Sequence, residues 1–340
     1  MKRIGIVGFG FMGHAHFKNY KEINGAQVVA ICDIVEQKLT GKYGPAGNIA
    51  CTEQELDLTG CDVFTDADKM FKDADLDAVS ITLPTFLHKE YTIKALNAGL
   101  DVICEKPMAL NSADCQVMAD AAEKCGKVLQ VGHCIRFWPE YVKTKELVDS
   151  GKYGKLITAT FHRLSLNPNW VWDNWLLDAK RSGGALLDLH IHDSDYIQYL
   201  FGMPDSVSTR AVKGPSGGYD HSVTQYIYND DEKIITAEGG WIMTKSFGFQ
   251  MSFEIILEKA VLCYDSKRKP TLTVYPDSGQ AFTPEIENGN GYLLELKHFV
   301  KSISGQSVPE IITPTQSLMS IKLVEAEKES ADLAQKINVL

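Results

Sequence analysis

The turn that begins at Gly8 constrains the fold of this chain more than any other stretch. Residues 2–7 form an apolar-rich run of strand length, glycines follow at 8, 10 and 13, and a helical pattern starts there. A strand, a G-x-G-x-x-G turn and a helix in this order are typical of a dinucleotide-binding site. Gly8 permits the tight turn, Gly10 lets the backbone approach a pyrophosphate, and Gly13 allows the helix to pack closely on the strand.

Asp33 supports this interpretation. The apolar run 28–32 ends in Asp33, which lies 20 residues beyond Gly13, the spacing at which an acid holds ribose hydroxyls. Because Asp33 would repel the 2′-phosphate of NADP and no Arg follows it to compensate, we expect NAD in preference to NADP. A solvated acid at the end of a strand is the alternative. Phe11 and Met12, inside the glycine turn, complete the cofactor contacts expected from this part of the chain.

The order of the elements predicts an α/β fold with two domains. Up to residue 131, short apolar strands alternate with helices, which indicates βαβ units and a doubly wound parallel sheet of the Rossmann type. From about residue 206 to residue 275, strands follow one another without helices between them, which favours antiparallel pairing. We therefore predict an NAD(P)-binding domain over 1–131. A substrate-binding and oligomerisation α/β domain with a large open, mainly antiparallel sheet is predicted over 132–340.

Three local expectations bear on the site. One helix is predicted near 35–42, and another runs without interruption over 184–201. The stretch 44–59 is rich in glycine and acids and is expected to be an inserted loop.

The composition excludes several classes of protein. The 34 basic and 44 acidic residues give a net charge of −10, so the chain lacks the basic excess of a nucleic-acid-binding protein. No apolar stretch has the length of a membrane span. The eight cysteines are scattered singly without a C-x-x-C pair, which favours a reduced, cytoplasmic chain over a disulfide framework or a zinc site. We expect no nucleic-acid partner, no membrane and no metal.

Asp188 and His192 are the candidate acid–base pair. They are four residues apart in the helix predicted over 184–201, a spacing that places two side chains on one face, and Asp195 follows on that face. A carboxylate beside a histidine orients the ring and favours its charged form, which suits a base that takes a hydroxyl proton. An ordinary helical ion pair is the alternative. A metal site is disfavoured, because His190 and His192 would share a face only on a strand.

A tryptophan-rich loop precedes this helix. Trp170 and Trp172 carry aromatic faces that suit the apolar face of a sugar ring. Packing of this loop between the two domains is the alternative for both. Arg136 and Arg163 would suit an acidic or phosphorylated substrate if they reach the pocket.

The strand-rich region is expected to leave one face of its sheet without helices. Tyr226, Tyr228, Trp241 and Met243 are expected to form an apolar surface there. Such a surface predicts a homodimer or homotetramer.

Several motifs, taken in order, resemble the Gfo/Idh/MocA oxidoreductases, a family that includes glucose–fructose oxidoreductase and inositol 2-dehydrogenase. The resemblance spans nearly the whole chain. It depends on GFGFMG at 8–13, Thr82-Leu83-Pro84 followed by His88, Glu105-Lys106-Pro107, Arg136 with Pro139, and Gly183-Gly184-Ala185-Leu186-Leu187-Asp188 with His192 and Asp195. His190 departs from the small residue that is common in the family, and we expect it to crowd or repolarise the pocket.

The resemblance implies NAD-linked oxidation or reduction of sugars, inositols and related polyols. It implies that Lys106 stabilises charge on the substrate oxygen, that His192 accepts the proton and that Asp188 lines the pocket with them. The cofactor residues that it adds are Thr82, Pro84, His88, Glu105 and Lys106. Two other functions stay open. A tightly held NAD would serve a redox-neutral sugar reaction such as epimerisation, elimination or glycosidic cleavage, or the chain would be a non-catalytic nucleotide-binding regulator.

Overall fold

The computed structural model describes residues 1–42, 55–229 and 233–339. Most of the loop expected at 44–59 therefore lies outside the described residues. The chain divides into two compact units by packing. Unit 1 consists of Met1–Cys134, Trp170–Trp175 and Asn290–Met319, and unit 2 consists of Ile135–Asn169, Leu176–Gly289 and Ser320–Leu340. The domain boundary expected at residue 131 stays a prediction, since units defined by packing collect segments from several parts of the chain.

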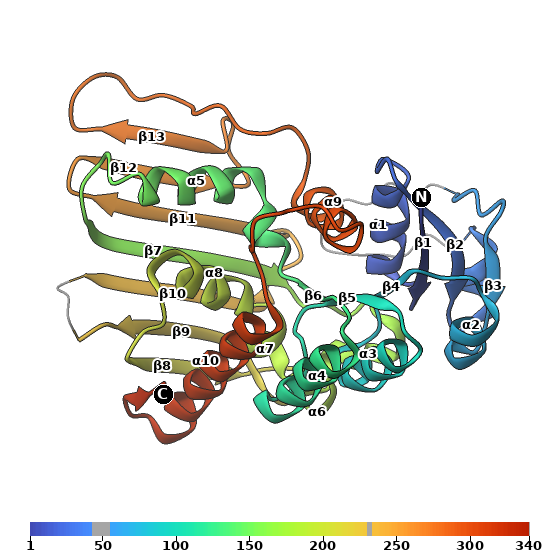
Figure 1. Ribbon diagram of the computed structural model, residues 1–340. Coiled ribbons are helices and arrows are strands. Elements are labelled where there is room, and N and C mark those ends of the chain that lie inside the picture. The colour runs from blue at the N-terminus through green and yellow to red at the C-terminus, as the bar shows by residue number, and fades with distance from the viewer. Residues whose placement is uncertain (43–54, 230–232, 340) are drawn as a thin grey trace. The chain divides into compact units, whose positions relative to one another are not determined.

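Unit 1 is built on a six-stranded parallel sheet (Figure 1). Its strands are β1 (Lys2–Val7), β2 (Ala26–Cys32), β3 (Asp62–Phe64), β4 (Ala78–Ile81), β5 (Asp101–Glu105) and β6 (Leu129–Gly132). Their order across the sheet is β3-β2-β1-β4-β5-β6, so the order reverses between β1 and β4. Ligands of such sheets bind at the carboxyl ends of the strands, at the reversal. The predicted doubly wound parallel sheet is confirmed.

The helices of unit 1 come from both ends of the sequence. They are α1 (Phe11–Tyr20), α2 (Ala67–Asp73), α3 (His88–Asn97), α4 (Ser112–Cys125) and α9 (Gly291–Ile303). The side chain of Asn111 accepts a hydrogen bond from the first turn of α4, and that of Asn290 does the same for α9. These caps satisfy amide groups that a helix start leaves without partners, and so fix where each helix begins.

The helix expected near 35–42 is a 3₁₀ helix over Glu36–Thr40. Gly41, with a φ of 74°, ends it in the left-handed region. At its start, Asp33 Oδ1 accepts a hydrogen bond from Val35 N at 2.9 Å. Both ends are therefore fixed, and the five residues between them form a 3₁₀ helix, beginning with the bond from Lys38 N to Val35 O at 3.0 Å.

The core of unit 1 joins the two ends of the chain. Ile4 and Ile6 of β1 are fully buried in a cluster that also contains Phe17 of α1. The apolar residues that α9 adds to this cluster are Leu293, Leu296, Phe299, Val300 and Ile303. Since burial of one such side chain contributes about 1.5–3 kcal/mol, α9 is a structural part of unit 1.

Unit 2 is built on an eight-stranded sheet. Its strands are β7 (Leu156–Leu166), β8 (Ser206–Lys213), β9 (Tyr219–Ile227), β10 (Ile234–Met243), β11 (Gln250–Leu257), β12 (Ala260–Asp265), β13 (Leu272–Pro276) and β14 (Ile337–Asn338). The order is β13-β12-β11-β7-β10-β9-β8-β14. β7 and β10 run parallel, and the other neighbours are antiparallel. The predicted mainly antiparallel sheet is confirmed, with one parallel pair that the sequence pattern did not indicate.

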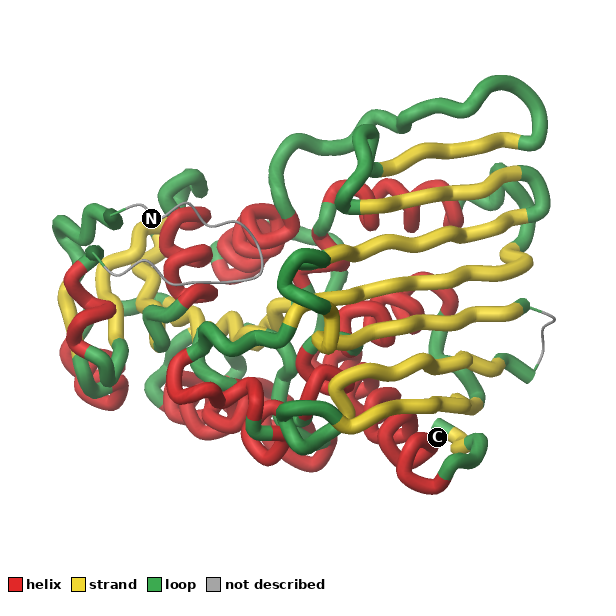
Figure 2. Tube along the Cα trace, turned by 180° about the vertical axis from the view of Figure 1, so that it is seen from behind, coloured by secondary structure: helices red, strands yellow, loops and turns green. Residues whose placement is uncertain are grey.

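The helices of unit 2 cover one face of this sheet (Figures 1 and 2). They are α5 (Pro139–Asp149), the short α6 (Ala179–Ser182) and α7 (Gly184–Asp188), α8 (Ile191–Phe201) and α10 (Pro314–Leu333), whose first residues belong to unit 1. Aromatic rings fill the space beneath them. The Tyr141 ring of α5 lies 4.8 Å from Tyr196 of α8 and 5.2 Å from Phe253 of β11, both edge to face, the geometry that aromatic quadrupoles favour.

The opposite face of this sheet carries no helix in the described part of the chain (Figure 2). The apolar surface expected from Tyr226, Tyr228 and Trp241 is wrong, because these side chains are 1%, 8% and 2% exposed. Side chains alternate between the two faces of a strand. The open face instead exposes large apolar residues at 45–55%, namely Val212, Val223, Ile234, Ile242 and Tyr275.

None of the helices in the described ranges combines the length and the apolar character that crossing a membrane requires.

Candidate cofactor and active site

The glycine turn has the geometry that its spacing predicts. Gly8 has a φ of +93°, and a Cβ there would lie 2.7 Å from Thr82 O. A Cβ on Gly13 would lie 2.2 Å from Gly8 O, whereas a Cβ on Gly10 would have nothing within 4 Å. Packing therefore excludes a side chain at Gly8 and Gly13, and Gly10 borders open space.

The start of α1 directs its amide groups to this space. Gly10 is the N-cap residue, no side chain caps the helix, and its first turn holds no acid. Phe11 and Met12, the first residues of α1, carry N–H groups that have no acceptor within the helix. Such groups and the positive end of the helix dipole favour a phosphate. The turn thus fits the pyrophosphate of a dinucleotide.

Asp33 follows β2, and its carboxylate is held in place. Its Oδ2 accepts hydrogen bonds from Phe9 N at 2.8 Å and from Lys38 Nζ at 3.1 Å. Asp33 and Lys38 are each 7% exposed. Lys38 was not expected here, because only an Arg after Asp33 was considered as a compensating charge. A lysine five residues beyond the ribose acid is the sequence signal that would have found it.

Trp172 lies beside this pair. Residues 170–175 pack with unit 1, and the Trp172 ring centroid lies 5.9 Å from Lys38 Nζ, within the range of a cation–π contact. The following Asp173 has a φ of 51°, and Asn174 one of 46°. The tryptophan loop therefore reaches the expected ribose position, and the sugar contacts expected of Trp170 and Trp172 stay predictions.

Thr82 and His88 connect the turns at the carboxyl ends of β1, β4 and β5. Thr82 Oγ1 donates to Gly8 O at 2.6 Å. The two ring nitrogens of His88 lie 2.8 Å from Leu83 O and 2.8 Å from Pro107 O. Pro84 precedes a 3₁₀ helix that leads into α3. One buried ring thus links the loop after β4 to the loop after β5.

Glu105 ends β5, and Lys106 follows it. Lys106 N donates to Glu105 Oε2 at 3.2 Å, and Glu105 Oε1 lies 3.1 Å from His16 Nε2 of α1. Lys106 therefore leaves the sheet at the same carboxyl edge at which Gly8 follows β1. His16 was not expected in this role, because only the glycines of the turn were considered.

The continuous helix expected over 184–201 is wrong. α7 ends at Asp188 and α8 begins at Ile191. Leu189 N and His190 N both donate to Ala185 O at 2.9 Å, so the second bond closes a wider turn than an α-helix has. Asp188 and His192 consequently belong to different helices, and the four-residue spacing does not place them on one helical face. Both are half-buried.

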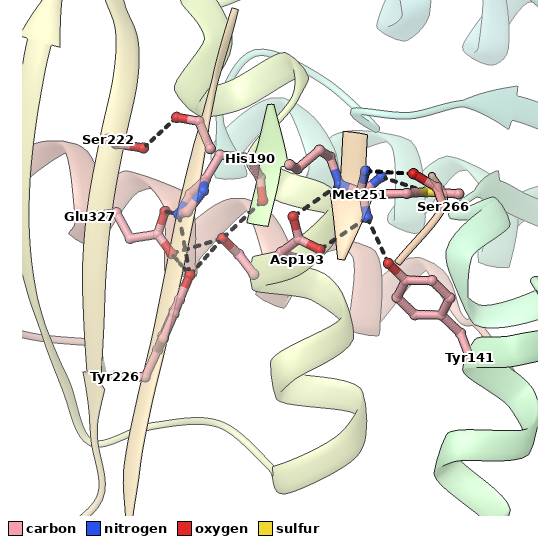
Figure 3. Close-up of polar contacts among 11 residues, drawn as sticks. Tyr141, His190, Asp193, Ser222, Tyr226, Met251, Ser266 and Glu327 are labelled. Carbon is pink, nitrogen blue, oxygen red and sulfur yellow. Dashed lines mark hydrogen bonds and ion pairs between the residues drawn. The ribbon is translucent and has the colours of Figure 1, made fainter. Parts of the chain in front are cut away.

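His190 faces the interior of unit 2 (Figure 3). Its Nε2 lies 3.3 Å from Tyr226 Oη and 3.5 Å from Glu327 Oε2, and a Cβ on Gly239 would lie 2.5 Å from its Nδ1. Burial lowers the pKa of His190 to about 3 and raises that of Glu327 to about 8. At neutral pH this contact therefore joins an uncharged imidazole to a largely uncharged carboxyl group. His190 therefore lies in the core of unit 2, and this position argues against the expectation that it crowds the pocket.

The two arginines considered for an acidic substrate form buried ion pairs. Arg163, 2% exposed, binds Asp193 through Nε and Nη2, each at 2.9 Å. Arg136 binds Asp195 in the same bidentate way, at 2.9 and 2.8 Å. These placements argue against a substrate contact for either guanidinium. Asp195, which pairs with Arg136, therefore does not share a helical face with Asp188 as expected.

Comparisons with known proteins agree with this geometry. Residues 2–133 match the family described as "Oxidoreductase family, NAD-binding Rossmann fold", and residues 141–263 match "GFO/IDH/MocA C-terminal domain". The myo-inositol 2-dehydrogenase of Thermotoga maritima is 26% identical, over 99% of this chain and 98% of that protein. The scyllo-inositol dehydrogenase of Lactobacillus casei, solved with NAD(H) and scyllo-inositol, has a TM-score of 0.79 and 26% identity, covering 100% of this chain and 99% of that one.

One relative is named as a hydratase, not as a dehydrogenase. The 2,7-anhydro-N-acetylneuraminate hydratase of Mediterraneibacter gnavus is 34% identical over 211 residues, which are 61% of this chain. The match covers 52% of the hydratase, about half its length. Both family matches and the open, uncapped glycine turn lead to the same conclusion: the chain belongs to the Gfo/Idh/MocA family of NAD-binding oxidoreductases.

Proposed function

We propose that this protein transfers a hydride between NAD and a hydroxyl carbon of an inositol, a sugar or a related polyol. The names of its relatives support this substrate class, among them the D-glucoside 3-dehydrogenase of Escherichia coli, 28% identical over 99% of this chain and 97% of that protein. The observation that carries the proposal lies within unit 1. Lys106 follows β5 at the carboxyl edge of the sheet, where the glycine turn follows β1.

In this proposal each catalytic side chain has one task, and NAD when bound supplies the hydride acceptor. The Lys106 ammonium donates to the substrate oxygen and stabilises the negative charge that develops there. His192 takes the hydroxyl proton, and Asp188 orients its ring. A positioned acid–base group contributes on the order of 10²–10⁴-fold to the rate. The motif order and the family support the roles of Asp188 and His192.

The test compares Lys106→Ala and His192→Ala with the parent protein on a panel of inositols, aldoses and keto-sugars, read as NADH absorbance. We expect kcat to fall by roughly 10²-fold or more in each, while the Kd for NADH, from fluorescence titration, changes less than about threefold. Lys124→Ala, on the exposed side of α4, is the matched control. Near-parental turnover in either test variant would reject the assigned roles.

A redox-neutral reaction is the second candidate, and the similarity to a hydratase favours it. A tightly held NAD would then take a hydride from the sugar and return it within one turnover. Purified protein would carry NAD at close to one equivalent. Product would form from the sugar without net NADH, whereas NADH formed in step with product would exclude this candidate.

We also propose a homodimer or homotetramer formed through the open face of the unit 2 sheet. The five exposed apolar side chains on that face support it, because such a surface is rarely left in water. Val223→Glu is expected to lower the mass measured by light scattering to that of a smaller assembly. Val117→Glu, at a position 49% exposed on α4 of unit 1, is the control. A monomeric parent protein would reject the proposal.

We propose a cytoplasmic location with no nucleic-acid partner. The cysteines in the described ranges are free thiols, which supports a reducing compartment, and the net charge of −10 is unfavourable for binding a polyanion.

A further inference from the structure

A buried contact between a histidine and a carboxylate lies beside the main chain of Lys106. His16 of α1 is 0% exposed and Glu105 of β5 is 5% exposed, and His16 Nε2 lies 3.1 Å from Glu105 Oε1. The space for the carboxylate comes from the neighbouring strand. Glu105 pairs with Gly132 of β6, and a Cβ on Gly132 would lie 3.3 Å from three atoms of the Glu105 carboxyl group. The position of the carboxylate is therefore built into three elements of unit 1.

The second oxygen of this carboxylate holds the main chain of Lys106. Lys106 N donates to Glu105 Oε2 at 3.2 Å. One carboxylate oxygen therefore contacts His16 and the other accepts from Lys106 N. These two contacts fix the orientation of the carboxyl plane. The direction in which the chain leaves β5, and with it the start of the Lys106 side chain, depends on this arrangement.

The groups around Glu105 keep the carboxylate ionised. Burial alone would raise its pKa, but the hydrogen bond and charge of His16, with the charges of Lys106 and His88, hold the pKa of Glu105 below its usual value. Glu295 of α9 faces the same place, and burial together with the charge of Glu105 raises the pKa of Glu295 well above its usual value. Cys104, the preceding residue of β5, is a buried thiol whose pKa burial raises. Among these groups, His16 bonds the carboxylate through its side chain, at 3.1 Å.

We propose that His16 is a positioning residue for the reaction: it holds the Glu105 carboxylate against the main chain of Lys106 and so directs Lys106 to the substrate oxygen. This inference rests on the role proposed above for Lys106. In this proposal α1 has two roles. Its first turn faces the expected pyrophosphate, and His16 in its second turn positions Lys106 through Glu105.

The pH dependence of kcat tests the inference, with NAD and substrate saturating. His16→Leu removes the first of the groups that offset the burial of Glu105 and lower its pKa, so the pKa of Glu105 rises. We expect kcat at neutral pH to fall about tenfold and its acid limb to move up by at least one pH unit, while the Kd for NADH stays within about threefold. His16→Gln, which keeps a hydrogen-bond donor, is expected to lie between this variant and the parent.

His14→Leu is the matched control, because His14 lies on the same helix, is 2% exposed and is kept uncharged by burial, which lowers its pKa to about 4. Damage to α1 alone would lower the melting temperature in both leucine variants and leave the acid limb where it is. An unmoved acid limb in His16→Leu therefore overturns the inference. If Lys106→Ala retains turnover, the proposed function fails first, so the two failures are distinct.

A measurement of the metal content of the purified protein tests the alternative that these residues bind a metal. His16, Glu105 and Glu295 offer ligand atoms that all lie within 4.8 Å of one another, a donor set that zinc accepts. We expect the purified parent to carry no stoichiometric metal and to keep its melting temperature on addition of Zn²⁺. One equivalent of metal in the parent that is lost in Glu295→Gln would overturn the inference in favour of a metal centre.

Discussion

At the scale of single residues, Asp33 and Lys38 set the charge where the adenosine ribose is expected. A carboxylate alone repels a 2′-phosphate, but here the ammonium of Lys38 lies 3.1 Å from Oδ2, and Lys38 is itself 7% exposed. Such a buried pair contributes most when both partners are present, because removal of one leaves an uncompensated charge. Asp33 thus disfavours the 2′-phosphate of NADP, and Lys38 partly offsets this effect.

Asp33→Ser is expected to raise the ratio of kcat/KM for NADP to that for NAD by at least about tenfold, because Lys38 then faces the 2′-phosphate without competition. The double variant Asp33→Ser with Lys38→Met is expected to lose most of this gain. Steady-state kinetics with both cofactors measure the ratio. Equal gains in the single and double variants would show that Lys38 does not reach the phosphate.

Glu327 makes stability depend on pH. Its pKa of about 8 in the folded chain lies above the usual value of a glutamate, so the folded chain holds this proton more tightly. The stabilisation is complete below the usual pKa near 4.5 and is lost as the pH rises through about 8, at about 1.4 kcal/mol per unit of pKa shift. Glu327→Gln keeps the shape of the side chain and removes this loss.

The melting temperature of Glu327→Gln is therefore expected to exceed that of the parent increasingly between pH 5 and pH 9. Scanning calorimetry at several pH values measures the difference. Glu329→Gln, exposed on the same helix, is the control and should show no such trend. A constant difference at all pH values would contradict the argument.

At the scale of elements, the glycine turn offers a matched pair of substitutions. Gly13→Ala places a Cβ 2.2 Å from a backbone oxygen, whereas Gly10→Ala meets nothing within 4 Å. We expect Gly13→Ala to lower the melting temperature and to weaken NADH binding. Gly10→Ala should keep the melting temperature and still weaken NADH binding about tenfold or more, because its methyl group enters the space of the pyrophosphate. Unchanged NADH affinity in Gly10→Ala would place the phosphates elsewhere.

The elements also show what the sequence could predict and where it failed. The parallel sheet, the glycine turn and the position of Lys106 follow from strand periodicity and from the steric need for glycine, both of which are local. The break between α7 and α8 does not, because residues 184–201 keep a helical pattern throughout. At the break, the His190 ring enters a core that contains Tyr226 and Glu327, and these residues are distant in the sequence. Likewise, the burial of Tyr226 and Trp241 depends on strand register, and a shift of one residue exchanges the two faces.

At the scale of the whole molecule, unit 1 needs a segment from the C-terminal part of the chain. A fragment of residues 1–134 lacks α9, so the face of α1 that packs on α9, in the core cluster that contains Leu296 and Phe299, would meet water. We expect this fragment to unfold at a much lower temperature than the same fragment joined to residues 290–319, as followed by circular dichroism. NADH should bind only the joined form tightly. Cooperative unfolding of the short fragment at the temperature of the joined one would refute this.

The late position of α9 has a consequence for how the chain is made. About 150 residues separate Cys134 from the start of α9, and at roughly 5–20 residues per second a ribosome needs about 8–30 s to add them. During that interval the nascent nucleotide-binding sheet carries an uncovered apolar face. Translation speed and chaperone supply, in addition to equilibrium stability, are therefore expected to govern the yield of active protein in a cell.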